Sequence, residues 1–113
     1  MHELSLAGNI LRIVESAAQQ DAFVRVRTLH LSVPVLAGVE VGALRFALES
    51  LAPRTLLDGA HLTIDEPASQ AHCLECARDI TVEDHGAPCP SCGSECWQLS
   101  GDRGVRVVEL LVE

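Results

Sequence analysis

Two pairs of cysteines offer the most specific chemistry in this sequence. Cys73 and Cys76 are separated by two residues, and Cys89 and Cys92 repeat that spacing after residues 77–88. Each pair can turn two sulfurs toward one ion, so this pattern is typical of a closed tetrahedral zinc site. An iron site of similar sulfur geometry, a redox dithiol and reduced free thiols are the alternatives. We predict structural zinc on these four cysteines.

Three further potential ligands lie close to these pairs in the sequence, namely Cys96, His72 and His85. Four cysteines already complete a tetrahedron. We therefore expect Cys96 to be an unliganded neighbour of the site. We expect His72 and His85 to be solvated.

The first three residues, Met1, His2 and Glu3, suggest a second and different metal chemistry. The free amine, the backbone amide of His2 and the His2 Nδ1 atom can close fused chelate rings, with the amide or side chain of Glu3 as a fourth donor. Four nitrogens in a plane suit Ni(II) or Cu(II). The amine must lose a proton to bind, so affinity should fall as pH drops. Taken alone, the tripeptide is weak evidence for a metal site, because a histidine at the start of a chain is more often exposed and unliganded.

Two amphipathic helices are predicted to position these groups. Apolar residues recur at helical spacing over residues 4–20, with Ser5 as a potential cap, so we expect residues 1–3 to lie just outside this helix. A second helix is expected over residues 40–51 and should end before Pro53. Glu40 would then lie at its start and complement the helix dipole.

Three strands complete the expected framework. Residues 27–33 alternate between apolar and polar side chains, residues 60–67 read as a second strand, and residues 105–113 are rich in β-branched side chains. All the cysteines fall between the second and third of these strands. The third strand should therefore close the sheet from the far side of an insertion.

The expected fold class is α+β, with a two-helix, three-stranded domain and an inserted zinc-ribbon-like domain that carries the four paired cysteines. The first domain is predicted over residues 1–68 plus 103–113, and the second over residues 69–102. Residues 67–72 and 100–104 are small, polar or turn-forming, and are expected to be linkers.

Composition excludes several functions. A net charge of −8 over 113 residues would repel a nucleic acid backbone. No apolar stretch is long enough to span a bilayer, and the start lacks a signal-peptide pattern. We expect a cytoplasmic protein with reduced thiols and no membrane partner. The absence of a phosphate loop, or of a nucleophile with an obvious base, argues against an enzyme.

Four motifs together resemble the HypA/HybF family of hydrogenase nickel-incorporation proteins: the start at residues 1–5, "LRFALE" at residues 44–49, the first cysteine pair, and "CPSCGS" at residues 89–94. The resemblance implies a nickel metallochaperone with a nickel-binding α/β domain and a structural zinc domain. There are departures, among them Pro34 after the first strand and Ala77 after the first cysteine pair, where the family usually has glycine.

The resemblance also implies residue roles and partners. His2 would be the principal nickel ligand, with the Met1 amine and Glu3 beside it, and an acidic residue near Glu40 would lie close to the site. The partners would be a HypB-type GTPase and the large-subunit precursor of NiFe hydrogenase, and the protein would be a monomer or homodimer. The alternative function is a zinc-ribbon adaptor that binds other maturation proteins without carrying nickel.

Overall fold

The computed structural model describes residues 2–100 and 104–113. The chain folds into two compact units. The first, which we call the helical unit, comprises Met1–Ser32, Val39–Asp65 and Arg106–Glu113. The second, which we call the cysteine unit, comprises Val33–Gly38 and Glu66–Val105. The short segment Val33–Gly38 thus belongs with the cysteines, although it lies between two elements of the helical unit.

The helical unit contains both predicted helices, α1 (His2–Asp21) and α2 (Val41–Leu51). The expected start of the first helix was wrong, because α1 begins at His2 and Ser5 does not cap it. His2 and Glu3 therefore lie in its first turn. An acidic residue is favourable there because it faces the positive end of the helix dipole.

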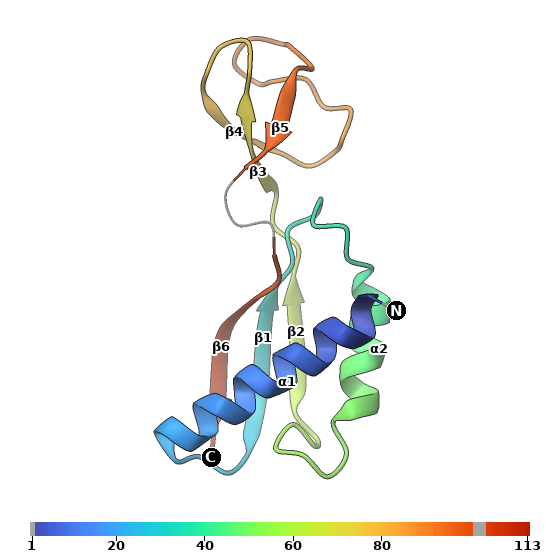
Figure 1. Cartoon of the computed structure of the whole chain (residues 1–113), viewed down its shortest axis with the longest axis vertical. Helices are drawn as coiled ribbons and strands as arrows, with labels where there is room; N and C mark the ends of the chain where they lie inside the picture. The colour runs from blue at the N-terminus through green and yellow to red at the C-terminus, as the bar shows by residue number, and fades with distance from the viewer. Residues whose placement is uncertain (1, 101–103) are drawn as a thin grey trace. The chain divides into compact units, whose positions relative to one another are not determined.

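The sheet of the helical unit consists of β1 (Val26–Ser32), β2 (His61–Asp65) and β6 (Arg106–Val112), in the order β2-β1-β6 (Figure 1). β1 pairs in parallel with β2 and antiparallel with β6. The last strand of the chain closes the sheet from beyond the insertion, as predicted.

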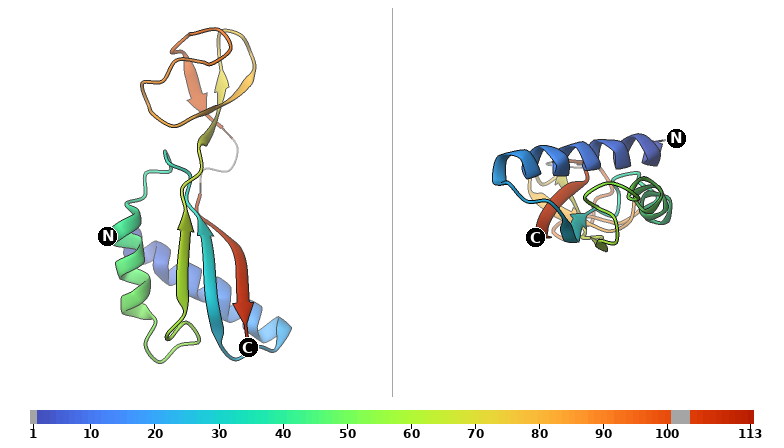
Figure 2. Two further views of the ribbon diagram at one scale, coloured as in Figure 1. Left: turned by 180° about the vertical axis from the view of Figure 1, so that it is seen from behind. Right: turned by 90° about the horizontal axis from the view of Figure 1, so that it is seen from below.

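One face of this sheet is covered by α1, which crosses behind the strands in the left view of Figure 2. Leu29 and Leu31 of β1 are almost completely buried. Burying a side chain of this size contributes about 1.5–3 kcal/mol. The helices contribute further buried apolar residues, which are Ala7, Ile10, Val14, Leu44, Ala47 and Leu48. Helix packing onto β1 therefore fixes where the first turn of α1 lies within this unit.

The cysteine unit has a three-stranded antiparallel sheet of β3 (Ser69–Cys73), β4 (Asp79–Val82) and β5 (Trp97–Leu99), in the order β4-β3-β5. The linker predicted over residues 67–72 was wrong, since most of it forms β3. Ser69, Ala71 and Cys73 are buried at alternate positions of that strand. Small side chains at those positions hid the two-residue period that marks a strand.

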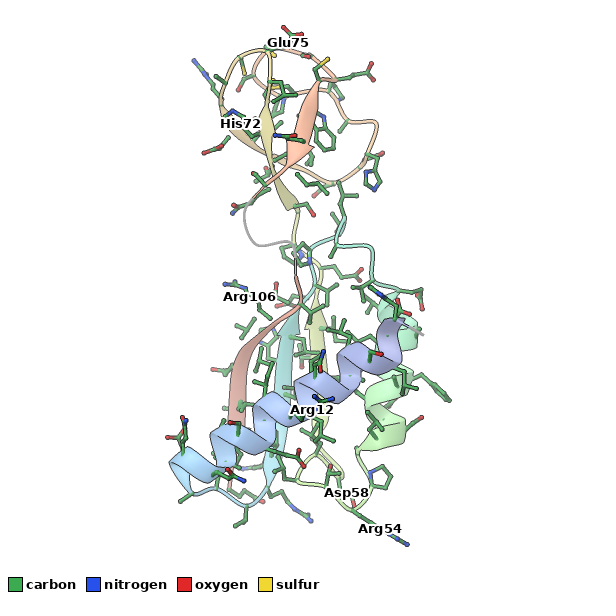
Figure 3. All side chains as sticks on the ribbon, in the orientation of Figure 1. Arg12, Arg54, Asp58, His72, Glu75 and Arg106 are labelled. Carbon is green, nitrogen blue, oxygen red and sulfur yellow. The ribbon has the colours of Figure 1, made fainter. Side chains whose placement is uncertain are left out.

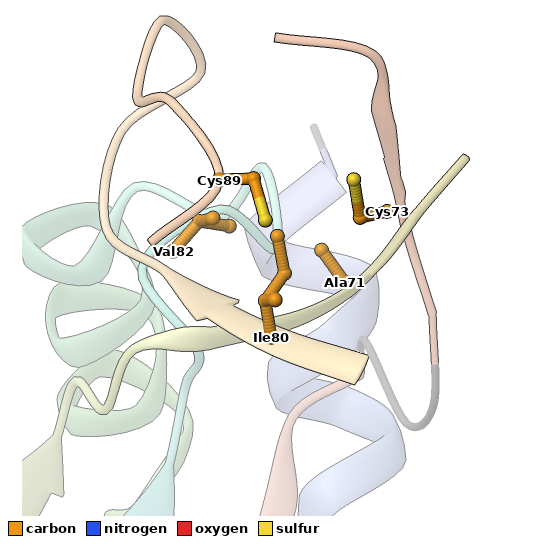
Figure 4. Close-up of a cluster of buried hydrophobic side chains, with 5 residues drawn as sticks. All are labelled: Ala71, Cys73, Ile80, Val82 and Cys89. Carbon is orange, nitrogen blue, oxygen red and sulfur yellow. The ribbon is translucent and has the colours of Figure 1, made fainter. Parts of the chain in front are cut away.

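The core of the cysteine unit, drawn in Figure 4, is small. Its buried members are Ala71, Cys73, Ile80, Val82 and Cys89, and its partly buried ones are Leu36, Cys76, Trp97 and Leu99. Two of the buried members are cysteines, so a metal ion bound by them would stabilise the same cluster as the apolar packing does. We call this set the cysteine core.

Neither α1 nor α2, the helices of the described part of the chain, is long and apolar enough to cross a membrane.

Candidate metal centres

Each cysteine pair forms a tight turn of the same design. The amide of Ala77 donates to the carbonyl oxygen of Cys73 at 3.0 Å, and the amide of Gly93 donates to that of Cys89 at 2.8 Å. The last residue of each turn has a positive φ, 57° at Ala77 and 78° at Gly93. Glycine adopts this conformation without cost, whereas alanine does so with strain. The departure from the family pattern at Ala77 therefore retains the turn at some energetic cost.

The four sulfurs converge on one point. The Sγ atoms of Cys73, Cys76, Cys89 and Cys92 all lie within 4.8 Å of one another. Across the two turns, Cys73 and Cys92 are separated by 3.6 Å, and Cys76 and Cys89 by 3.8 Å. A disulfide would need about 2.05 Å. A tetrahedron with Zn–S bonds of about 2.3 Å has edges of about 3.8 Å, so the spacing fits zinc.

The local environment gives the cysteine thiols different pKa values. Burial opposes ionisation of Cys89, but the backbone amides of Cys92 and Ser91 donate toward its sulfur and lower its pKa to about 6. The Ser91 amide lies 3.4 Å from that sulfur. For Cys92, the backbone amide of Ser94 favours the thiolate, yet burial and the neighbouring sulfurs outweigh it and raise the pKa to about 12. Burial likewise raises the pKa of Cys76. The backbone amides around Cys89 therefore favour the thiolate at this position more than at Cys76 or Cys92.

Among the described residues, the other potential ligands His72, His85 and Cys96 are not part of the four-cysteine cluster. His72, labelled in Figure 3, places Nδ1 at 3.0 Å from Asp79 Oδ1. Cys96 is exposed, and its amide donates to Ser94 Oγ at 3.0 Å. His85 is exposed as well. That these three residues do not bind the metal stays a prediction.

The second candidate site lies at the start of α1. His2 is exposed. Glu3 Oε2 accepts a hydrogen bond from the backbone amide of Glu40 at 3.0 Å. That bond, together with the amide of Glu3 itself, lowers the pKa of the Glu3 carboxyl. Met1, the remaining predicted ligand, lies outside the described residues.

Glu40 has a double role that its sequence position only partly indicates. Its carboxylate caps α2 by accepting from the amides of Gly42 at 3.2 Å and Ala43 at 2.6 Å. Its own amide meanwhile binds Glu3. An acidic residue just before an apolar period indicates the cap. The contact with Glu3 joins residues far apart in the sequence, and no local pattern predicts it.

Together, these features define a small α+β protein with a four-cysteine metal site in one unit and an acidic, histidine-bearing helix start in the other. The model of the family described as "Hydrogenase/urease nickel incorporation, metallochaperone, hypA" matches residues 1–112. The chain belongs to this HypA family.

Curated relatives support the assignment. The chain is 51% identical to a hydrogenase maturation factor HypA of Polaromonas naphthalenivorans, over 99% of this chain and 97% of the relative. It is 49% identical to the HypA of Cupriavidus necator, over 100% and 95% of the two chains. These are maturation factors of a metallochaperone family, and the protein is accordingly a maturation factor rather than an enzyme.

Solved structures agree on the fold. The solution structure of the Ni metallochaperone HypA from Helicobacter pylori matches with a TM-score of 0.74 at 15% identity, covering 97% of this chain and 96% of that one. Another HypA solution structure matches with a TM-score of 0.71 at 18% identity, covering 100% and 97% of the two chains. The sulfur cluster is compatible with the structural zinc of a nickel metallochaperone.

Proposed function

We propose that this protein carries Ni(II) on its first three residues and delivers it during maturation of NiFe hydrogenase. The observation that carries the proposal is the start of α1 at His2, within a family described as incorporating nickel. A helix leaves its first-turn amides without intrahelical acceptors. The amides of His2 and Glu3 are therefore open to replacement of their protons by a metal.

The proposed nickel donors are the atoms of residues 1–3 that are not already used in other hydrogen bonds. The Glu3 carboxylate accepts from Glu40, so the Glu3 backbone amide is the more available fourth donor. The Met1 amine, the His2 amide and the His2 imidazole supply the other three. This set of nitrogens suits square-planar Ni(II), whereas zinc prefers a tetrahedron.

We assign Cys73, Cys76, Cys89 and Cys92 as ligands of the structural zinc. When bound, the ion joins the two turns and stabilises the cysteine core. Thiolates also bind nickel strongly, so zinc in this site keeps the cargo from being retained there. Nickel on nitrogen donors can still be released to a recipient, because protonation of the amine competes with the metal.

The proposed recipients are a HypB-type GTPase and the large-subunit precursor of NiFe hydrogenase, and the proposed compartment is the cytoplasm. Membership in a family of hydrogenase maturation factors supports an interaction with other maturation components. We also propose that the nickel-binding and zinc-binding roles belong to the sequence-predicted domains, residues 1–68 plus 103–113 and residues 69–102.

The proposal is tested by titrating zinc-loaded, untagged protein with NiCl2. His2→Ala and a version extended by one residue before Met1 should each lose most of the affinity and the absorption band of planar nickel. His61→Ala is the matched control, because His61 is an exposed histidine at the start of β2. Equal affinity in all four proteins would overturn the terminal site and favour the adaptor function.

A further inference from the structure

An apolar groove lies between the start of α1 and α2, two helices of the helical unit that pack against each other (Figures 1 and 2). Its volume is about 360 Å³. The residues that line it are Glu3, Leu4, Ala43, Phe46, Ala47 and Ser50. Leu4 is 45% exposed and Phe46 is 71% exposed. Covering such side chains is favourable, so this groove, which we call the terminal groove, offers a partner apolar surface to bury.

The exposure of Phe46 follows from the geometry of α2. The buried residues of this helix are Leu44, Ala47 and Leu48. Phe46 is two positions away from both leucines, and a helix turns by about 100° per residue, so a step of two places a side chain on nearly the opposite side. Phe46 therefore cannot join the buried face unless the whole helix rotates. The bulkiest apolar side chain of α2 thus remains on its solvent side.

One end of the terminal groove is anionic. Among the described residues that line it, Glu3 alone is ionisable, and the hydrogen bond from the Glu40 amide lowers the pKa of the Glu3 carboxyl. The chain as a whole contains no lysine and has a net charge of −8. A segment that fits this groove should therefore combine apolar side chains with a Lys or Arg. A second copy of this acidic chain would be repelled instead.

The elements around the terminal groove favour a helix as its occupant. Both walls are helices, and the backbone groups within a helix are already paired, so an added strand would find no free edge there. Along α2 the groove follows Ala43, Ala47 and Ser50, which are spaced four and three residues apart. This is the course of a row of side chains on a helix surface, against which a second helix packs its own side chains.

We propose that the terminal groove is the docking site for an amphipathic helix of the protein that receives nickel. An apolar side chain of that helix covers Phe46 and Leu4, and a Lys or Arg about one turn away pairs with Glu3. Docking at this position brings the recipient beside the cargo, because the groove begins at a residue of the proposed nickel terminus. The inference rests on the proposed function for the identity of the partner, but the side chains of Phe46 and Leu4 supply no nickel donor.

The test measures, by isothermal titration calorimetry, how tightly the purified HypB-type GTPase binds the zinc-loaded protein. Phe46→Ala removes the apolar ring, and Glu3→Gln removes the charge while keeping an acceptor for the Glu40 amide. Ile13→Ala is the matched control, because Ile13 is a 55% exposed apolar residue of α1 that does not line the groove. The Kd for NiCl2 and the oligomeric state, from analytical ultracentrifugation, are measured for each protein as well.

Phe46→Ala should raise the Kd for the GTPase by about tenfold or more and leave the Kd for NiCl2 unchanged. Glu3→Gln should raise the Kd for the GTPase less, and should make it less sensitive to NaCl. Ile13→Ala should change neither constant. An unchanged Kd in the Phe46→Ala protein, an equal loss in the Ile13→Ala protein, or no binding by the unsubstituted protein would overturn the inference.

A dimer that Phe46→Ala dissociates would also overturn it, because a second copy would then occupy the groove. The proposed function is judged separately by His2→Ala. If that variant binds nickel as tightly as the unsubstituted protein, the proposed function fails, and the GTPase titration still decides the groove. If His2→Ala abolishes nickel binding while Phe46→Ala binds the GTPase normally, only the groove assignment fails.

Discussion

The indole Nε1 of Trp97 donates a hydrogen bond to the carbonyl oxygen of Ala87 at 2.7 Å. This bond joins β5 to the chain just before the second cysteine turn. Trp97 also pairs across the sheet with Cys73 and packs against the cysteine core. The single tryptophan of the sequence therefore lies beside both cysteine turns.

Removal of zinc should shift the fluorescence of Trp97 to longer wavelength, because the loosened cysteine core admits water to the indole. The measurement is an emission spectrum before and after chelation, with zinc counted by plasma mass spectrometry. Readdition of zinc should restore the spectrum. An unchanged emission maximum after full zinc loss would show that apolar packing alone holds Trp97 in place.

Replacing a ligand should differ sharply from replacing the neighbouring fifth thiol. Cys73→Ser removes one of four sulfurs and should weaken zinc binding by more than about 100-fold, since even residues that only support a ligand cost 10–100-fold. Cys96→Ser should bind zinc like the unsubstituted protein, because Cys96 is exposed and outside the sulfur cluster. Competition with a chromophoric chelator measures both. Equal losses in the two proteins would contradict the ligand assignment.

Zinc affinity should fall as pH falls, with a slope set by the thiols. The pKa of Cys92 is raised to about 12 and that of Cys76 is also raised, so zinc must displace both protons at pH 7. Cys89, with a pKa of about 6, is ionised at pH 7 and adds a further proton only below about pH 6. The logarithm of the affinity should rise by at least about two per pH unit near pH 7, and more steeply below pH 6. Chelator competition from pH 5.5 to 7.5 measures this slope, and a value below one would refute it.

Exchanging the positive-φ residue should destabilise the second cysteine turn and leave the stability of the first nearly unchanged. Gly93→Ala adds a side chain with open space around it, so its cost is only that of the backbone, about 1 kcal/mol. Ala77→Gly relieves the same strain but adds freedom to the unfolded chain, so its net effect should lie within about 0.5 kcal/mol of zero. Thermal unfolding of the zinc-loaded proteins provides the comparison. Greater destabilisation by Ala77→Gly would contradict the backbone argument.

The cap on α2 should account for a measurable part of the stability of the helical unit. Glu40→Ala removes the acceptor for the amides of Gly42 and Ala43 and should cost about 1 kcal/mol in the free energy of unfolding. Glu40→Gln keeps one acceptor oxygen and should cost less. Urea unfolding followed by circular dichroism measures both. The hydrogen bond from the Glu40 backbone to Glu3 is available in each variant, so a Gln variant as unstable as the Ala variant would contradict the cap.

Local sequence patterns determined the elements and the sulfur site of this protein. Helical and alternating periods predicted α1, α2, β1, β2 and β6, because burial of one face imposes a period on the chain. Paired cysteine spacing predicted the sulfur cluster, because a two-residue gap suits two sulfurs on one ion. The matching start and cysteine motifs also predicted the family that the comparisons showed.

Tertiary structure alone decided how residues distant in the sequence act together. β3 was missed because its buried positions are held by the small residues Ser69, Ala71 and Cys73, which carry little apolar signal. The docking of Leu36 on the cysteine core and the hydrogen bond between Glu3 and Glu40 join segments more than 30 positions apart. Such contacts depend on how the strands and helices pack within each unit. A local sequence pattern cannot predict such contacts, because the residues involved are far apart in the sequence. The hydrogen bond between Glu3 and Glu40 is the contact of this kind at the first turn of α1.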